Sequence, residues 1–271
     1  MAPVERLLLS PRAGPGVCTT CFNLIDEYER CYACARGQNV LDAVAPISYS
    51  VAHEPLHRTL FGYKRLPPEL ARGYRAELIM ILRTFLEHHE ECVARAAGVA
   101  GFALVTTVPS GDRHRDAEHP LPRLVIAALA GTRERYQRLL CRSAFESGDR
   151  AYDFLKYLAV RPLQGETVLL VDDTWTTGAN AQSAAAALKS AGAGRVAAIV
   201  IGRHVNRDWH DNDRRLASLV GRFEWDRCAL CAPRALSAGA NLGDGGAGSL
   251  PPGLAMAGKQ DVGVDRLDRV E

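Results

Sequence analysis

The chain of 271 residues lacks several features that would fix its class at once. It has no apolar run near the length of a transmembrane helix, which argues against a membrane-spanning protein. Met1 to Gly16 lack the cationic start and sustained apolar stretch of an export signal, so we expect a cytoplasmic protein. The first 45 residues hold four arginines against five acids, and so lack the basic surface of a duplex-binding module. We expect neither membrane association nor direct nucleic-acid binding.

Apolar residues make up 47% of the chain, and its length allows one domain with a substantial core plus appendages. The last segment, 235–271, contains eight glycines and little apolar periodicity, which predicts a flexible tail. We therefore expect a small cysteine-rich module at 1–45, a main domain at 46–234 and a tail at 235–271.

Six of the eight cysteines form three Cys-x-x-Cys pairs: Cys18 with Cys21, Cys31 with Cys34, and Cys228 with Cys231. Two such pairs can complete a tetrahedral zinc site. We assign a structural zinc to Cys18, Cys21, Cys31 and Cys34, because local pairs close a smaller loop. The third pair either stays reduced near this knuckle or replaces one of its pairs. The competing interpretations are a disulfide framework, which a reducing cytosol disfavours, and a redox pair on a thioredoxin-like unit.

The most informative stretch is the apolar run Val168 to Val171, which ends in Asp172 and Asp173. Such a run predicts a central strand of a parallel sheet with helices on both faces, and these sheets bind ligands at the carboxyl ends of their strands. Ala179 to Lys189 are rich in helix formers, with Gly192 placed to end the helix. The loop between strand and helix consists of Thr174, Trp175, Thr176, Thr177 and Gly178.

A loop at a helix N-terminus suits a bound phosphate, because free N–H groups and the helix dipole favour an anion there. Two adjacent carboxylates beside it match a ribose phosphate, whose vicinal hydroxyls need acceptors. The sequence also allows a doubly wound domain whose strand ends in acids for no such reason.

A second candidate loop follows a predicted strand from Phe102 to Val108. The amides of Ser110 and Gly111, with the side chain of Arg113, can hold a pyrophosphate, although these residue types are also common in ordinary turns. Arginines between 133 and 160 either attract an anionic ligand or form a solvated charged face.

The remaining pattern completes an alternation of helices and strands. A long helix is predicted over Pro67 to Ala97, a second over Leu121 to Ala130, and a strand over Val196 to Ile201. The side chains of His88, His89 and Cys92 are interpreted as a solvated helix end, with a metal site as the alternative. Cys92 and Cys141 are interpreted as small buried hydrophobes.

The segment Leu169 to Gly178 resembles the phosphoribosyl-pyrophosphate motif of type I phosphoribosyltransferases. With the N-terminal cysteines, the chain resembles the ComF family, which includes DNA-uptake competence proteins, over most of residues 18–204. Three further segments carry the resemblance, namely Leu60 to Arg65, Val105 to Ser110 and Val168 to Arg203. The resemblance implies a type I phosphoribosyltransferase-like α/β fold: an open, mainly parallel sheet with helices on both faces, plus an N-terminal zinc knuckle.

The resemblance also implies roles for residues. Asp172 and Asp173 would bind the ribose 2′ and 3′ hydroxyls and serve in catalysis, the Thr174 to Gly178 loop would bind the 5′-phosphate, and Mg²⁺ would accompany the pyrophosphate. One segment departs from the family: members commonly carry Arg-Gly-Phe-Asn-Gln where this chain has Glu118-His119-Pro120-Leu121-Pro122. The main hypothesis is a phosphoribosyltransferase with an unknown acceptor. The alternative is a non-enzymatic module for metabolite sensing or for contacts with a protein partner in DNA uptake.

Overall fold

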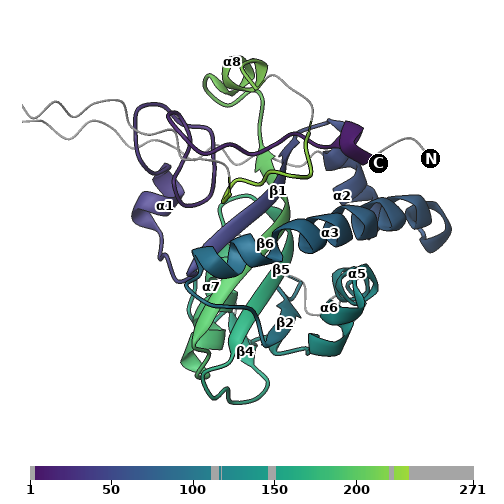
Figure 1. Ribbon diagram of the computed structural model, residues 1–271, viewed down its shortest axis with the longest axis vertical. Helices are drawn as coiled ribbons and strands as arrows, with labels where there is room; N and C mark the ends of the chain where they lie inside the picture. Colours follow the sequence, from purple (N-terminus) through teal and green to yellow (C-terminus); the bar gives the residue numbers. More distant parts are fainter. Residues whose placement is uncertain (1–3, 111–115, 117, 146–150, 220–222, 232–271) are drawn as a thin grey trace, which may run out of the picture. The chain divides into compact units, whose positions relative to one another are not determined.

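The computed structural model describes residues 4–110, 116, 118–145, 151–219 and 223–231, which belong to one compact unit, Met1–Leu236. Its centre is a sheet of four parallel strands in the order β1-β6-β5-β2 (Figure 1). These strands are β1 (Ala43–Val51), β2 (Leu104–Thr107), β5 (Thr167–Trp175) and β6 (Arg195–Val205). The predicted α/β class with a parallel sheet is confirmed.

The sheet is covered on both faces, which explains why β5 begins as a continuous apolar run. Leu169 and Val171 face a core built with α2 (Pro55–Arg65), α3 (Pro68–Ala96) and α5 (Leu121–Ala128). Val168 and Leu170 face the opposite core, which contains α7 (Ala179–Ser190) and a two-stranded antiparallel sheet of β3 (Leu140–Arg142) and β4 (Tyr157–Ala159). All four of these β5 side chains are fully buried.

Helix α3 matches its predicted bounds to within one residue at each end. Pro68 occupies the first turn, where its missing N–H costs no hydrogen bond. Gly98 follows the last turn in the left-handed region, at a φ of 73°. Apolar side chains at helical spacing form a stripe on α3 that is buried in the core, apart from the half-buried Ile79: Leu78, Ile79, Ile81, Leu82, Phe85 and Leu86. Figure 1 shows α3 crossing the strands.

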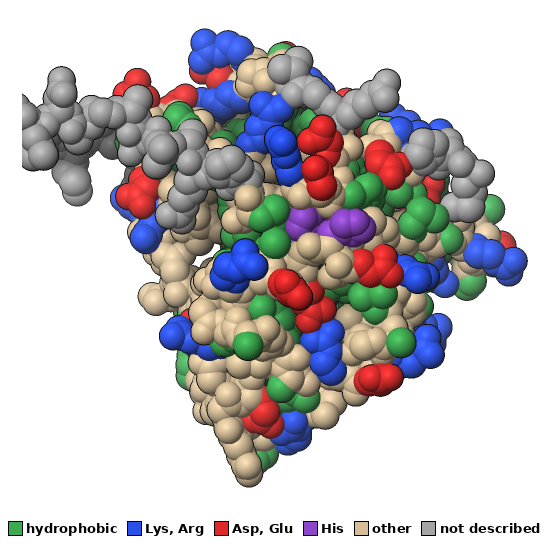
Figure 2. Space-filling view, in the orientation of Figure 1, with side chains coloured by type: hydrophobic (Ala, Val, Ile, Leu, Met, Phe, Trp, Pro, Cys, Tyr) green, Lys and Arg blue, Asp and Glu red, His purple; other side chains and the backbone are tan. Residues whose placement is uncertain are grey.

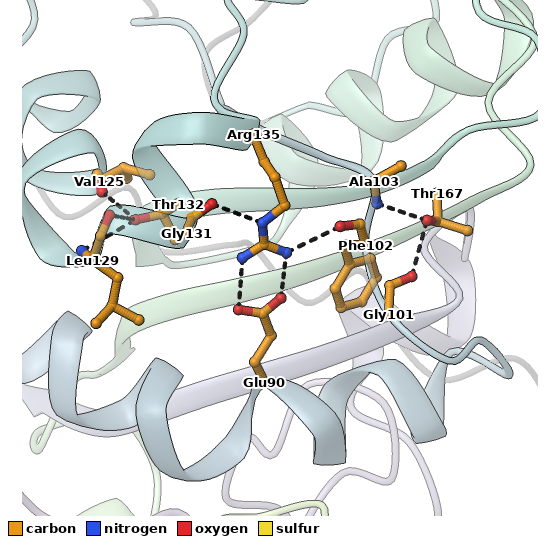
Figure 3. A network of polar contacts seen from close by, with 10 residues as sticks. All are labelled: Glu90, Gly101, Phe102, Ala103, Val125, Leu129, Gly131, Thr132, Arg135 and Thr167. Carbon is orange, nitrogen blue, oxygen red and sulfur yellow. Dashed lines mark hydrogen bonds and ion pairs between the residues drawn. The ribbon is translucent and has the colours of Figure 1, made fainter.

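A polar network joins α3 to α6 (Ala130–Arg135) and to the segment that leads into β2 (Figure 3). Arg135, at the end of α6, donates to both carboxylate oxygens of Glu90 on α3, at 2.5 and 3.0 Å. The same guanidinium donates to the Phe102 carbonyl at 3.0 Å. The Thr132 hydroxyl donates to the Val125 carbonyl at 2.9 Å and so connects α6 to α5. Arg135 therefore has a structural role and does not form part of a free cationic surface.

Three short helices lie outside the sheet layers: η1 (Val4–Leu7), α1 (Tyr32–Arg36) and α8 (Asn212–Ala217). The helix predicted over Leu121 to Ala130 is interrupted at Leu129, between α5 and α6. The predicted tail, 235–271, lies outside the described residues. Within the described ranges, none of the helices has the length and apolarity needed to cross a bilayer.

Candidate functional site

A polar cavity of about 540 Å³ lies at the carboxyl end of β5. Strand β5 supplies Asp172, Asp173 and Thr174 to its lining, and the following loop supplies Thr176. The rest of the lining comes from four other parts of the chain, and its polar members are Lys64, Arg65, Ser110, Glu118, His119 and Asn180. The structure thus brings Ser110 of the second candidate loop to the same cavity as Thr174 and Thr176, at the edge where parallel sheets bind ligands.

The two acids project to opposite faces of β5, because successive side chains of a strand alternate. Asp173 is 3% exposed and faces α2. The Tyr63 hydroxyl donates to its Oδ2, and the Lys64 ammonium lies 2.7 Å from Oδ1 and 2.6 Å from Oδ2. His119 Nε2 lies 4.0 Å from Oδ2 of Asp173. Asp173 is therefore already engaged by protein partners.

Asp172 is half-buried and has a different environment. Its Oδ1 accepts the backbone N–H of Asp173 at 2.9 Å. Burial, followed by the neighbouring Asp173 charge, raises the pKa of Asp172 to about 7. For Asp173, burial acts in the same direction, but the Lys64 charge and its hydrogen bond outweigh it, and the pKa of Asp173 is lowered. Near neutral pH the pair thus carries a fixed charge on Asp173 and a titrating one on Asp172.

The loop predicted over Thr174 to Gly178 is shorter in the structure, because β5 continues through Trp175 and only Thr176, Thr177 and Gly178 lie between strand and helix. The Trp175 side chain is 2% exposed and lies beneath the loop, so the Trp175 side chain does not line the cavity. Gly178 has a φ of 83°, and a Cβ at this position would lie 2.1 Å from Cζ2 of Trp175. Only glycine fits, and it places Ala179 as the first residue of α7. First-turn N–H groups of a helix have no partner within the helix, which suits an anion at this end.

The second candidate loop is partly described. Ser110 lines the cavity, and its backbone N–H donates to Asp116 Oδ1 at 2.8 Å. Arg138 pairs with the other oxygen of Asp116 at 2.5 Å. Gly111 and Arg113, both predicted to hold pyrophosphate, lie outside the described residues.

Two buried polar atoms of the cavity wall have no hydrogen-bond partner among the described residues, namely His119 Nδ1 and Asn180 Oδ1. Burial lowers the pKa of His119; the Asp173 charge opposes this effect, and the Lys64 charge adds to it. Because unsatisfied buried groups cost free energy, these two atoms mark places where a bound ligand can complete a hydrogen bond.

The four N-terminal cysteines lie together, as predicted. All four are buried, and their four sulfur atoms lie within 4.8 Å of one another. A bridge between Val17 and Leu24 closes the first turn, and α1 follows Cys31 directly. The Cys21 thiol, followed by those of Cys31 and Cys34, lowers the pKa of Cys18 through hydrogen bonds. This group can hold a metal ion such as zinc.

Arg203 on β6 connects this cysteine cluster to the end of β5. It is 5% exposed, and its guanidinium donates to the Trp175 carbonyl at 3.1 Å and to the Cys21 carbonyl at 3.2 Å. Its Nη2 also lies 3.8 Å from the Cys21 sulfur. One buried cation therefore joins the cluster to the residue that begins the cavity loop.

The third cysteine pair does not join the N-terminal cysteines, so the prediction that it replaces one of their pairs is wrong. Cys228 and Cys231 lie beside His89 and Cys92 on α3. His89 is 3% exposed, so the interpretation of this helix end as solvated is also wrong for His89. Cys92 and Cys141 are half-buried rather than fully buried.

Sequence reasoning missed the partners of Asp173. Tyr63 and Lys64 stand at the end of α2, and His119 precedes α5. Tyr63 and Lys64 lie 110 and 109 residues from Asp173 in the sequence, so no local sequence pattern predicts these contacts. The one available signal was the resemblance to the ComF family, since Lys64 lies in the segment Leu60 to Arg65 and His119 in the segment that departs from the family pattern.

Comparison of the chain with protein-family models gave no match, and comparison with curated proteins gave no relative. The ComF resemblance therefore stays a prediction from the motifs.

Proposed function

We propose that the cavity binds phosphoribosyl pyrophosphate with Mg²⁺, and that the chain is a phosphoribosyltransferase of the ComF type on a type I phosphoribosyltransferase-like fold. The observation that carries this proposal is the juxtaposition of Asp172 with the glycine-closed loop at the start of α7, around one polar cavity. An anion site next to a carboxylate suits a sugar phosphate better than a bare phosphate, because the carboxylate would repel the latter.

Each part of the donor has a matching group. The loop amides and the hydroxyls of Thr174 and Thr176 would hold the 5′-phosphate, and Asp172 would accept the ribose hydroxyls. Lys64 and Ser110 line the opposite wall, where they would face the pyrophosphate. The carboxylates of Asp172 and Glu118 are oxygen donors of the kind that Mg²⁺ prefers, so the lining fits the metal. Bound Mg²⁺ would neutralise pyrophosphate oxygens.

The reaction would break the bond between ribose C1 and a pyrophosphate oxygen while the acceptor forms a bond to C1. Pyrophosphate would leave with the electrons of the broken bond. The chain's own contribution would be to fix the sugar and to stabilise charge, since an already nucleophilic acceptor needs little proton transfer.

We also propose that Cys18, Cys21, Cys31 and Cys34 bind a structural zinc ion. Four thiolates form a closed tetrahedral set, typical of zinc that stabilises a fold. Through Arg203, loss of this zinc would disturb the carbonyl of Trp175 and hence the phosphate loop.

Turnover is tested by measuring pyrophosphate release from Mg²⁺ and phosphoribosyl pyrophosphate across a panel of nucleobases and amines. The proposal expects release with at least one acceptor, and loss of that release in Thr176→Val. A protein that binds the donor but releases no pyrophosphate with any acceptor would contradict the catalytic part.

A specific observation favours the second candidate, a non-enzymatic module that senses a metabolite or contacts a protein partner in DNA uptake. Asp173 is held by Tyr63, Lys64 and the nearby His119, and so is less available to a ribose than Asp172. His119 lies in the segment that departs from the ComF pattern. Binding of the donor without turnover would support this candidate.

Direct nucleic-acid binding is the least supported role. Figure 2 shows acidic and basic side chains interspersed over the face that α3 crosses, with no broad area of one sign among the coloured residues there. Backbone contacts to a duplex require clustered Lys and Arg.

A further inference from the structure

Four metal-ligating side chains from two distant segments meet beside α3. His89 and Cys92 are three residues apart on the helix and so share one face. Cys228 and Cys231 come from the segment 223–231. One ligand atom from each residue lies within 4.8 Å of the others. The sulfurs of Cys92 and Cys231 lie 3.7 and 3.8 Å from His89 Nδ1.

The orientation of His89 is that of a metal ligand. Its Nε2 lies 2.8 Å from the Trp225 carbonyl, which can only accept a hydrogen bond. Nε2 therefore carries the proton, and the lone pair of Nδ1 faces the three sulfurs. Metal-bound histidines have this arrangement, in which the second ring nitrogen donates to a carbonyl or carboxylate. The adjacent His88 is exposed and contacts the Thr84 carbonyl of its own helix instead.

The Cys228-Ala-Leu-Cys231 turn is also organised for a metal. The backbone N–H of Cys228 donates to the Cys231 sulfur at 3.1 Å, and the N–H of Cys231 donates to the Cys228 carbonyl at 3.2 Å. The turn points both thiols toward α3, and an N–H donor to sulfur stabilises a thiolate.

We propose that His89, Cys92, Cys228 and Cys231 bind a second zinc ion. Three thiolates and one imidazole form a complete tetrahedral set, and soft sulfur ligands favour zinc over magnesium or calcium. Because four protein ligands leave no position for a reacting water, the site is structural. It shares no residue with the polar cavity at the end of β5 or with the N-terminal cysteine cluster.

The second zinc attaches the segment 223–231 to the main domain. Other contacts of this segment are a hydrogen bond from Trp225 Nε1 to Glu5 at 2.7 Å and the packing of apolar side chains against the core, namely Phe223, Trp225, Cys228, Ala229 and Leu230. A link between Cys92 and Cys228 closes a long loop of chain, and closing long loops restricts the unfolded state most. We expect zinc removal to release Trp225 from its site, with a change in tryptophan fluorescence.

Zinc content measured by elemental mass spectrometry tests the site in the full chain, purified under reducing conditions. The wild type should carry two zinc ions per chain. Cys228→Ser with Cys231→Ser should carry one, and Cys141→Ser, whose sulfur lies outside both clusters, should keep two. A wild type with one zinc that the double variant retains would overturn the proposal.

The histidine ligand gives a sharper comparison, because its neighbour is a matched control. His89→Ala should lose one zinc, His89→Cys should keep it through a fourth thiolate, and His88→Ala should keep both. Equal zinc content in His89→Ala and His88→Ala would remove His89 from the site.

Cobalt replacement keeps the test valid if a variant fails to fold. Wild-type protein loaded with two equivalents of Co²⁺ should show thiolate-to-cobalt absorption that continues to grow through the second equivalent. Absorption that saturates after one equivalent contradicts a second thiolate site. A mass two hydrogens below that of the reduced chain, with one zinc, would indicate a disulfide in this cluster and would also reject the proposal.

Discussion

Replacing Asp172 by asparagine should stabilise the protein, and more so as pH rises. Asparagine keeps an oxygen that can accept the Asp173 N–H at 2.9 Å but removes the charge. Burial and the Asp173 carboxylate raise the pKa of Asp172 from 3.8 to about 7. A carboxyl whose pKa is higher in the folded state disfavours folding once pH exceeds its unfolded value, and the full cost is reached above its folded value.

The size of the effect follows from these two pKa values. Removing the carboxyl should raise the free energy of unfolding by about 2 kcal/mol at pH 5 and by about 4 kcal/mol at pH 8, as upper values. Urea unfolding followed by circular dichroism at pH 5, 6, 7 and 8 measures this trend. Asp213→Asn is the control, because the Asp213 side chain is 68% exposed, and it should change stability by less than about 1 kcal/mol at any of these pH values. A gain in Asp172→Asn that is constant or shrinks with rising pH would refute the reasoning.

Three further outcomes are expected. Gly178→Ala should lower the free energy of unfolding by about 3 kcal/mol or more, because φ is +83° and the new Cβ would overlap the buried indole of Trp175. Gly165→Ala, where φ is +86° but the Cβ would meet open space, should lower it by about 1 kcal/mol, and urea unfolding compares the two variants. Donor affinity measured by calorimetry should rise about tenfold from pH 6 to pH 8, because Asp172 accepts hydroxyls when ionised, and Asp172→Asn should lack that rise. Glu90→Gln should cost about 1–3 kcal/mol in thermal unfolding by leaving Arg135 poorly paired, and much less in an Arg135→Met background.

The elements with strong local signals were predictable. Helix α3 is marked by Pro67 and Pro68 at its start and Gly98 after its end, and its apolar stripe repeats at helical spacing. Strand β5 was recognisable because both of its faces are buried, which requires an unbroken apolar run. The helix after the loop begins at Ala179, as predicted, but β5 continues through Trp175, so Thr174 and Trp175 of the predicted loop belong to the strand.

Strand β1 gave no such signal. It contains Pro46, Ser48 and Ser50, yet eight of its nine residues are buried. The Ser48 hydroxyl is satisfied by the backbone of Leu9, 39 residues away, so a tertiary contact allows a polar residue in a central layer. Pattern reasoning cannot foresee such compensation.

The grouping of the cysteines shows the same limit. Spacing identified the cluster of Cys18 to Cys34 because its members are close in sequence. The partners of Cys228 lie more than 130 residues away on α3, and only the fold brings them together. Asp173 and Tyr63, 110 residues apart, are a third case.

The central claim is that the cavity at the end of β5 holds a sugar phosphate between Asp172 and the loop before α7. Calorimetry of zinc-replete protein with phosphoribosyl pyrophosphate, with and without Mg²⁺, tests it most directly, using Asp172→Asn combined with Asp173→Asn as the comparison. The account predicts magnesium-dependent binding by the wild type and its loss in the double variant. Absence of binding by the wild type, or equal affinity in the double variant, would contradict it.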